Sequence, residues 1–560
     1  MISRRSRSAL EDTSNSDNAD DATTSPSEAL RGHKRRFNAA QWLTFGLPAL
    51  VSLAIGFWQL ATPGAIAGLT AYDDGVYFGA ALQWVNGAWP YRDFVFLHPP
   101  GIILLMSPIA LFGKVFGTEN GLEVARVCTA FVATLNVVLV VALVRRHGRV
   151  AAVLAGTLMA LFPLAVANSS TLTLEPYLVL FVLAASGALA RAISSVNPNR
   201  WLIASGALFG VAGLVKIWAI FPFVVASICV VMWFTRQSWR FFLGAAAAFA
   251  VPAAPFIALN PGSFWHDVIV DQVIRQASVY QQVSLSGRLS DILGFPGLPG
   301  SWLSPTVAVV AMLVGVAGVA FAFWVDIKSP QRGDVLLLGV TCSTLVCLLV
   351  GSEFQLFYSY FSAPFLAVLF VLVLHKIVRG VRTRWPVRHG PRNHDSRVFK
   401  VAVAVLFAGA TVAMASHDFS YQRQFIEYNL RGNSGTVAEP GVVVSVAIPA
   451  GACAISDSPA ALILGNRYLS TTPGCPAIVD PYGMFLALND GVAPPNASTP
   501  VASFTDQWQS YFEEAQFVVL TFPYSGYVPW TTGLESWFNQ NYTLISSSPF
   551  AYIYQNRNSS

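Results

Sequence analysis

Long apolar runs separated by short polar segments dominate the first three quarters of the chain. Runs of about twenty apolar residues are long enough to cross a bilayer as a helix. We predict about eleven such spans, at residues 39–60, 122–144, 150–168, 177–195, 201–216, 217–234, 241–259, 302–325, 335–352, 360–377 and 399–416. The apolar run at 101–117 is shorter, and we expect it to lie along the outer membrane surface as a juxtamembrane helix.

The basic residues predict how these spans are oriented, because cytoplasmic loops carry an excess of Lys and Arg. With 101–117 kept out of the membrane, the basic clusters all fall on the cytoplasmic side, at 31–36, 145–149, 235–240, 326–332 and 376–400. The outer face then collects the loops at 63–121, 168–176, 260–301 and 353–359. This assignment requires 201–234 to form two short helices that meet at Lys216, since a single span there would invert everything after it.

The two ends of the chain differ from the middle. Residues 1–36 are polar and charged, with too few apolar residues to fold, and we predict a disordered cytoplasmic tail. After the membrane domain at 37–417, strand-like runs at 441–448, 515–522 and 551–554 alternate with helix-like runs at 458–465 and 533–541. This alternation predicts a small extracytoplasmic α/β domain over 418–560.

Composition supports a mainly α-helical, polytopic protein of the cell membrane. Of the 560 residues, 54% are hydrophobic and only 11% are charged, and the mean hydropathy is +0.54, more than a soluble domain needs to fill one core. The net charge of +5 is explained by the cytoplasmic loops, so nucleic acid is not an expected partner. Membrane lipid is.

Six cysteines are present, and four of them lie in apolar runs. Cys453 and Cys475 are the two in the C-terminal region. Because an oxidising exterior favours disulfides, we expect these two to be joined. No group of Cys and His has the spacing of a zinc site.

Two polar motifs follow the first span, and they are the main candidates for chemistry. The run AYDDGVYF at 71–78 contains Asp73 and Asp74, and the run YRDFVFLHPPG at 91–101 contains Arg92, Asp93 and His98. Ionisable groups at a membrane surface are costly to place there without a use. The alternative is that Asp-Asp-Gly forms only a solvated turn.

These motifs, together with Arg126 at the start of the next span, resemble the GT-C superfamily of glycosyltransferases that use polyprenyl-phosphate sugars. The chain looks most similar to the protein O-mannosyltransferase and aminoarabinose transferase branch, and the Asp-Asp form also resembles bacterial cell-wall arabinofuranosyl- and mannosyltransferases. The resemblance covers residues from about 40 to 380. It implies inverting transfer of one sugar, mannose or arabinofuranose, from a polyprenyl phosphate to a glycan, glycolipid or protein acceptor at the outer face.

The resemblance also implies roles for the two carboxylates. A sugar hydroxyl has a very high pKa, so a carboxylate within hydrogen-bond distance must accept its proton as the new bond forms. Asp73 and Asp74 match the acidic position of the family, and we favour Asp73 as the base. Its neighbour would orient the acceptor or a divalent cation, so such a cation is possible, and no other cofactor is expected.

The leaving group would be a lipid phosphate, which requires fixed positive charge near the membrane surface. Arg126, Lys216 and Arg275 are the candidates. The alternative for Lys216 is snorkelling of its ammonium group to the interface. Glu175 resembles an acidic residue that the family carries near the donor, although a helix-start role beside a proline competes with this interpretation.

The remaining candidates have structural alternatives of similar weight. His98 would contact phosphate or acceptor, or would satisfy backbone groups of its own loop. Tyr358 and Tyr360 resemble an aromatic element of the family, and the alternative is an interfacial aromatic belt. Arg92 and Asp93 are placed among the substrate-binding candidates, but a structural ion pair between them is the more natural interpretation.

Two other classes of function stay open at this point. A flippase for lipid-linked sugars would carry charged residues within its spans and an internal repeat, neither of which the sequence displays. A non-catalytic scaffold for cell-envelope assembly would leave the Asp-Asp motif without a role.

Overall fold

The computed structural model describes residues 39–62, 64–274, 283–294, 331–351, 353–384, 416, 440–488, 502–521, 523–524, 527–548 and 551–558. The described residues from Leu43 onwards belong to one compact unit. The predicted tail at 1–36, the predicted spans at 302–325 and 399–416, and the predicted domain boundary at 417/418 lie outside the described residues, apart from Ser416.

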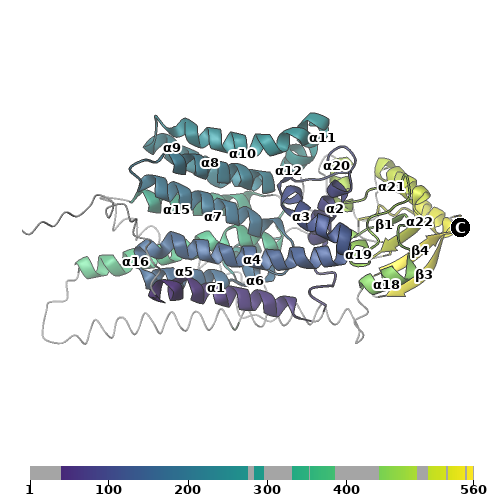
Figure 1. The fold of residues 1–560 in the computed structure, drawn as a ribbon, viewed down its shortest axis with the longest axis horizontal. Helices are drawn as coiled ribbons and strands as arrows, with labels where there is room; N and C mark the ends of the chain where they lie inside the picture. The colour runs from purple at the N-terminus through teal and green to yellow at the C-terminus, as the bar shows by residue number, and fades with distance from the viewer. Residues whose placement is uncertain are drawn as a thin grey trace, which may run out of the picture. The chain divides into compact units, whose positions relative to one another are not determined.

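Among the described residues before residue 385, the regular elements are all helices (Figure 1). The α-helices are α1 (Ala39–Leu60), α2 (Tyr72–Val85), α3 (Gly101–Phe116), α4 (Thr118–Val144), α5 (Arg149–Ala160), α6 (Pro163–Ala167), α7 (Leu174–Ile193), α8 (Asn199–Val215), α9 (Ile220–Trp233), α10 (Ser238–Leu259), α11 (Pro261–Trp265), α12 (Asp271–Ile274), α13 (Leu285–Ile292), α15 (Arg332–Val350) and α16 (Ala363–Arg384). Short 3-10 helices are η1 (Arg145–His147), η2 (Ile217–Ala219) and η5 (Leu356–Phe361), and η3 (His266–Val270) is a π-helix.

Within the described residues, five helices are long and apolar enough to cross a membrane, at Gln41–Leu60, Thr118–His147, Leu174–Ile193, Ser238–Leu259 and Arg332–Val350. Shorter apolar helices lie beside them. Among the membrane-type helices, the most extensive packing is between α8 and α10, between α7 and α8, and between α4 and both α5 and α7. Many large apolar side chains on these helices are exposed, such as Leu50 on α1 and Val251 on α10. Apolar side chains that face outward suit a lipid environment. The number of spans stays a prediction.

The chain breaks at Lys216, as the sequence predicts. Helix α8 ends at Val215, Lys216 itself is extended, and η2 leads into α9. The region 201–234 therefore forms two short helices.

The segment predicted as a span at 150–168 is not one continuous helix, because α5 ends at Ala160 and α6 starts at Pro163. Phe162 between them is extended, with ψ of 118°. A proline disfavours helical geometry in the residue before it, which explains the break.

The C-terminal part, from residue 440, combines helices with one four-stranded sheet within the described residues. Its elements are α18 (Pro440–Ala447), β1 (Ala454–Ser456), α19 (Pro459–Leu464), α20 (Pro481–Leu488), α21 (Ala502–Glu514), β2 (Phe517–Leu520), α22 (Thr532–Asn541), β3 (Tyr542–Ser548) and β4 (Ala551–Asn556). The strand order is β1-β2-β4-β3; β1 pairs with β2 in parallel, and the other pairs are antiparallel. The predicted α/β character is therefore present.

The run 441–448 was predicted as a strand and is instead helix α18. Its valines favour a strand locally, but both ends are set up for a helix. Pro440 occupies the first helical position, where its missing N–H costs nothing. At the other end the Arg467 guanidinium donates to the carbonyls of Ser445, at 2.7 Å, and Ile448, at 2.5 Å. A cation on the last carbonyls stabilises a helix end.

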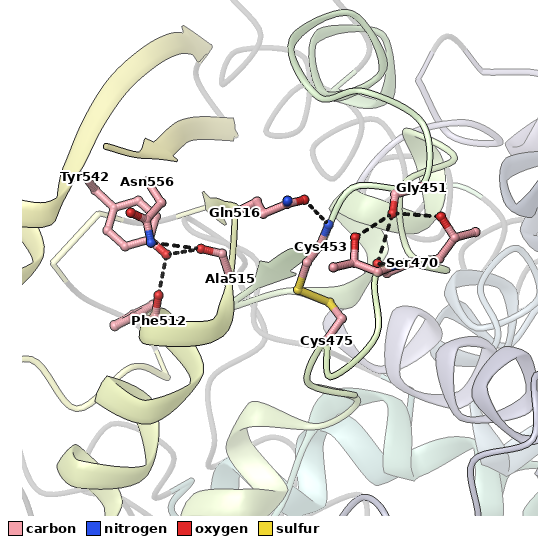
Figure 2. Close-up of a disulfide and its surroundings, with 11 residues drawn as sticks. Gly451, Cys453, Ser470, Cys475, Phe512, Ala515, Gln516, Tyr542 and Asn556 are labelled. Carbon is pink, nitrogen blue, oxygen red and sulfur yellow. Dashed lines mark hydrogen bonds between the residues drawn. A yellow bond between two sulfur atoms is a disulfide. The ribbon is translucent and has the colours of Figure 1, made fainter. Parts of the chain in front are cut away.

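A disulfide joins Cys453, just before β1, to Cys475 (Figure 2). The two α-carbons are 5.4 Å apart. The Cys453 backbone N–H donates to the side-chain oxygen of Gln516 at 2.9 Å, which connects the disulfide to the residue before β2. The pairing expected from the sequence is the one the structure contains.

The C-terminal part packs directly onto α2 and α4. A Cβ on Gly75 would lie 2.6 Å from the backbone nitrogen of Ala460 in α19, so only glycine allows this approach. At the start of α4, the Thr118 hydroxyl donates to the Ile463 carbonyl at 2.6 Å. Leu97, from the loop before α3, is buried in the C-terminal core. The first polar motifs are thus enclosed by residues more than 350 positions later in the chain.

At the other end of α4, a cluster of charges joins three helices. Arg146 in η1 and Lys376 in α16 lie 2.6 Å and 3.2 Å from the carboxylate of Asp334 in α15. Asp334 is almost fully buried. This cluster holds together the ends of α4, α15 and α16, at the opposite end of α4 from the contact with the C-terminal part.

Candidate functional site

Asp73 and Asp74 lie in the first turn of α2, a helix rather than the solvated turn considered as the alternative. Carboxylates are favoured at this position because the helix N-terminus carries partial positive charge. Asp74 is fully buried, whereas Asp73 is partly exposed. The two neighbours therefore have different environments, and their chemistry differs accordingly.

Asp74 is bound to Arg126, and both side chains are inaccessible to solvent. Its Oδ2 accepts hydrogen bonds from Arg126 Nε at 2.9 Å and Nη2 at 2.6 Å, and from the Thr70 hydroxyl at 3.1 Å. The same guanidinium donates to the carbonyls of Ala65, at 3.3 Å, and Gly68, at 2.9 Å. Arg126 therefore fixes the loop before α2 as well as Asp74, and this pair positions α2 from the side of α4.

The second motif forms a tight loop whose conformation is locked from several sides. Tyr91 has a positive φ of 66°, which is rare outside glycine. Its hydroxyl donates to the His98 carbonyl at 2.5 Å, and its own carbonyl accepts from Asn260 at 3.2 Å. Gln272 donates to the Leu97 carbonyl at 2.9 Å. Asn260, at the end of α10, and Gln272, in α12, thus hold the loop that carries His98.

His98 points towards α2. Its Nε2 is 3.4 Å from the Tyr77 hydroxyl, one helical turn after Asp73. Tyr77 is buried, and burial together with the Asp73 carboxylate holds the pKa of its phenol well above the usual value. Glu175 and Tyr358 raise this pKa further. Tyr77 therefore lies where the two motifs meet, within electrostatic reach of Glu175.

Glu175 at the start of α7 pairs with Lys216 at the end of α8, with 2.6 Å between Oε1 and Nζ. Both side chains are almost fully buried. The Lys216 ammonium also lies over two aromatic rings, 3.6 Å from the Trp218 centroid and 4.3 Å from that of Tyr358. Such contacts stabilise a desolvated cation. Lys216 does not snorkel to an interface; it is held in an enclosed aromatic and acidic setting.

Gly101 brings the His98-Pro-Pro turn to this cation. A Cβ on Gly101 would lie 2.5 Å from the backbone carbonyl of Leu214, next to the end of α8. The start of α3 and the residues before Lys216 are therefore in backbone contact. Glycine is required here for close approach, a reason the sequence does not reveal.

Two functional candidates from the C-terminal part were not predicted. Asp480, at the start of α20, accepts a hydrogen bond from the Tyr72 hydroxyl at 2.9 Å. Tyr527 lies with its ring centroid 4.6 Å from that of Tyr72. Burial and then the Asp73 carboxylate raise the pKa of Tyr527, as do Asp480 and Glu353. No pattern in the sequence marks these residues, because their only connection with Asp73 is spatial.

A possible cation site lies in the segment after α10. Atoms of His266, Asp267 and Asp271 that could bind a metal lie within 4.8 Å of one another, the one such group among the described residues. Carboxylates and an imidazole suit several divalent ions. Burial and the Asp271 carboxylate raise the pKa of Asp267 to about 7, and Asp480 contributes to this shift. Asp267 also accepts a hydrogen bond from the Phe96 N–H at 3.5 Å, so the group lies beside the loop that carries His98. The involvement of a cation stays a prediction.

Several predicted site residues lie elsewhere. Arg92 and Asp93 form an exposed ion pair of 2.7 Å, with 45% and 33% of their side chains accessible. Tyr360 is fully buried, and its hydroxyl accepts from Asn136 at 3.0 Å, so its position indicates packing between helices and does not support a substrate role. Arg275 lies outside the described residues.

The structure thus brings together a partly exposed carboxylate (Asp73), an imidazole (His98) and a desolvated cation paired with an acid (Lys216 and Glu175). A carboxylate can accept a proton. A fixed cation in a setting of low dielectric can stabilise an anionic leaving group. These are the parts that a group transfer from a phosphate ester to a hydroxyl requires.

Comparison with known proteins supports this interpretation. The family model of dolichyl-phosphate-mannose-protein mannosyltransferases matches residues 98–258. The sequence has no significant match among curated proteins.

Two solved structures have a similar fold. The crystal structure of ArnT from Cupriavidus metallidurans bound to undecaprenyl phosphate has a TM-score of 0.58 at 16% identity, over 93% of this chain and 99% of that chain. The archaeal oligosaccharyltransferase AglB from Archaeoglobus fulgidus, in complex with an inhibitory peptide and a dolichol-phosphate, has a TM-score of 0.50 at 15% identity, over 92% of this chain and 74% of that chain. The family model thus covers residues 98–258, and the two solved structures show that the chain shares their fold.

Proposed function

We propose that the chain transfers one sugar from a polyprenyl-phosphate donor to an acceptor hydroxyl at the outer face of the membrane, with inversion at the anomeric carbon. The observation that carries this proposal is the division between the two neighbouring carboxylates. Asp74 is committed to Arg126 inside the protein, while Asp73 is partly exposed beside Tyr77. One carboxylate therefore positions α2, and the other is partly accessible from solvent.

In the proposed step the acceptor oxygen attacks the anomeric carbon, and the bond from that carbon to the phosphate oxygen breaks. The hydroxyl proton passes to the Asp73 carboxylate, and the bonding electron pair leaves with the lipid phosphate. Lys216 stabilises the charge on the departing phosphate, since its pairing with Glu175 uses one of its three N–H donors. His98, whose ring lies against Tyr77 of α2, is a second donor towards phosphate or acceptor.

Mannose is the sugar favoured by the description of the matching family model, and arabinofuranose is the second candidate, from the style of the Asp-Asp motif. The lipid phosphates in the two similar structures, undecaprenyl phosphate in ArnT and dolichol-phosphate in AglB, support a polyprenyl carrier. The acceptor is a glycan, a glycolipid or a protein. The end of the helices that carries α2 and the sheet is proposed to face outward.

The test uses purified full-length protein in lipid nanodiscs, radiolabelled polyprenyl-phosphate mannose, arabinofuranose and glucose, and extracted envelope glycolipids as acceptors. Wild type is expected to transfer from one donor, and Asp73→Asn to lose at least about 100-fold in rate, the usual size of a general-base contribution. Asp506→Asn, which changes an exposed carboxylate on α21, is the matched control. Equal rates for Asp73→Asn and wild type would exclude Asp73 as the base. No transfer from any donor by folded protein would favour a flippase or a scaffold.

A further inference from the structure

Three tyrosines and one carboxylate form a compact group next to Asp73. The ring of Tyr527 contacts those of Tyr72 and Tyr482, with centroid distances of 4.6 Å and 5.4 Å and tilts near 50°. The Tyr72 hydroxyl donates to Asp480 Oδ1 at 2.9 Å and accepts from the Tyr482 backbone N–H at 3.0 Å. We call these four residues the tyrosine cluster.

The tyrosine cluster joins two parts of the chain at the site. Tyr72 is the first residue of α2 and precedes Asp73 directly, whereas the other three come from the C-terminal part. Gly483 N–H donates to the same Asp480 oxygen at 2.9 Å, which fixes the carboxylate at the start of α20. The cluster is therefore built into the fold, and it is not a chance contact of surface side chains.

Tyr527 faces the charges of the site. Apart from burial, the Asp73 carboxylate is the largest influence that raises the pKa of Tyr527, and Glu353, on the segment before η5, acts in the same direction. Tyr527 itself is half-buried. A molecule that reached Asp73 from the side of the C-terminal part would meet this ring.

Aromatic faces beside a fixed carboxylate suit a carbohydrate. The C–H face of a sugar ring packs on an aromatic ring, whose face carries partial negative charge, and vicinal hydroxyls donate to carboxylate oxygens. A peptide acceptor would instead need partners for its backbone N–H and C=O groups, and the tyrosine cluster offers rings and one acidic side chain. The chemistry of the cluster thus favours a sugar over a peptide.

We propose that the tyrosine cluster is the acceptor subsite, that the acceptor is a carbohydrate, and that Asp480 and Tyr527 are its specificity-determining residues. This inference rests on the proposed glycosyltransfer and adds the class of acceptor to it. The proposed donor residues, Lys216 and His98, do not belong to the tyrosine cluster, so donor and acceptor functions are carried by different residues and can be measured separately.

The experiment measures initial rates against the concentration of a glycan acceptor, and separately the binding of radiolabelled donor, for full-length protein. Tyr527→Ala is expected to raise the acceptor KM about tenfold, the loss of one ring contact and one hydrogen bond, with donor affinity unchanged. Tyr527→Phe should give a smaller increase. Tyr524→Phe is the control, since Tyr524 lies in the same segment but bonds Asn539 at 2.7 Å.

Two results would overturn the inference and leave the proposed function standing. One is an acceptor KM in Tyr527→Ala equal to that of wild type. The other is transfer by wild type to a peptide acceptor and to none of the glycans. If wild type binds no donor and transfers nothing, the proposed function fails. Direct binding of oligosaccharides then decides the inference by itself: binding to wild type that is lost in Tyr527→Ala supports it, and equal binding or none contradicts it.

Discussion

Gly75 and Ala460 are in backbone contact: a Cβ on the first would lie 2.6 Å from the nitrogen of the second. Gly75 directly follows the two carboxylates, and Ala460 lies in the first turn of α19. The glycine of the Asp-Asp-Gly motif therefore serves the docking of the C-terminal part on α2. The position of Asp73 depends on this contact.

We expect Gly75→Ala to push α2 away from α19 and to reduce transfer at least tenfold, because small displacements of a reacting group are costly. Thermal unfolding should also start at a lower temperature. Gly46→Ala in α1 is the control, since a Cβ there meets nothing within 4 Å. Wild-type activity in Gly75→Ala would show that the contact does not set the position of Asp73.

The ion pair of Asp74 and Arg126 predicts strong coupling. Removing one partner leaves a buried charge, so Asp74→Asn and Arg126→Gln should each lower the free energy of unfolding by about 3 kcal/mol. The double variant should lose less than the sum of the two, by at least about 1 kcal/mol. Chemical denaturation of the four proteins in the same detergent measures this cycle, and additive losses would contradict the pairing.

Lys216 and Glu175 allow structural and binding effects to be separated. Lys216→Met alone should destabilise the protein, because the Glu175 carboxylate then lacks its cation. Lys216→Met combined with Glu175→Gln should recover most of the stability. Donor affinity should nevertheless stay about 30-fold below wild type in the double variant, the loss of one charged hydrogen bond to phosphate. Donor binding by the double variant equal to wild type would remove Lys216 from the donor site.

Asp291, in α13, predicts a pH dependence of stability. Burial raises the pKa of its carboxyl to about 7. Between about pH 4 and 7 the unfolded chain has lost this proton and the folded protein keeps it, so stability is full below pH 4 and declines as pH rises to 7. The decline is at most about 4 kcal/mol.

Melting temperatures from pH 4 to 8 should show a shallower decline for Asp291→Asn than for wild type. Asp93 provides the opposite sign, since its hydrogen bonds with Arg92 lower its pKa. Its contribution is present at neutral pH and is lost in acid, so Asp93→Asn should alter the profile only at low pH. Identical slopes for Asp291→Asn and wild type would contradict the buried position of this carboxyl.

Much of the helical part follows from sequence because apolar runs of membrane length leave few alternatives. The break at Lys216 was predicted from the loops, because a single span over 201–234 would place the later basic loops on the outer face. The valine run at 441–448 is the opposite case: local preference favours a strand, and the partner that stabilises the helix end, Arg467, lies about twenty residues later. Such contacts are invisible to a local pattern.

The candidate site shows the same limit. Asp73, Asp74 and His98 were found in the two polar motifs after the first span, and Lys216 and Glu175 were found through the family resemblance; neither signal needs a structure. Their pairing was not predicted, because the partners are distant in the sequence. Asp74 and Arg126 are 52 positions apart, and Lys216 and Glu175 are 41 positions apart. Asp480 and Tyr527 carry no local signal at all, since an aspartate before a proline and a tyrosine in a loop are common.

The bond between Tyr72 and Asp480 spans 408 positions of the chain, and this separation bears on how a new molecule matures. Helix α2 leaves the ribosome early, before nearly all of the membrane helices, while α19 and α20 are among the last segments made. A nascent chain therefore holds the proposed base without the surface that positions it. Under the proposed function, we therefore expect transfer only after the segment that carries Ala460 and Asp480 has been made and has docked on α2.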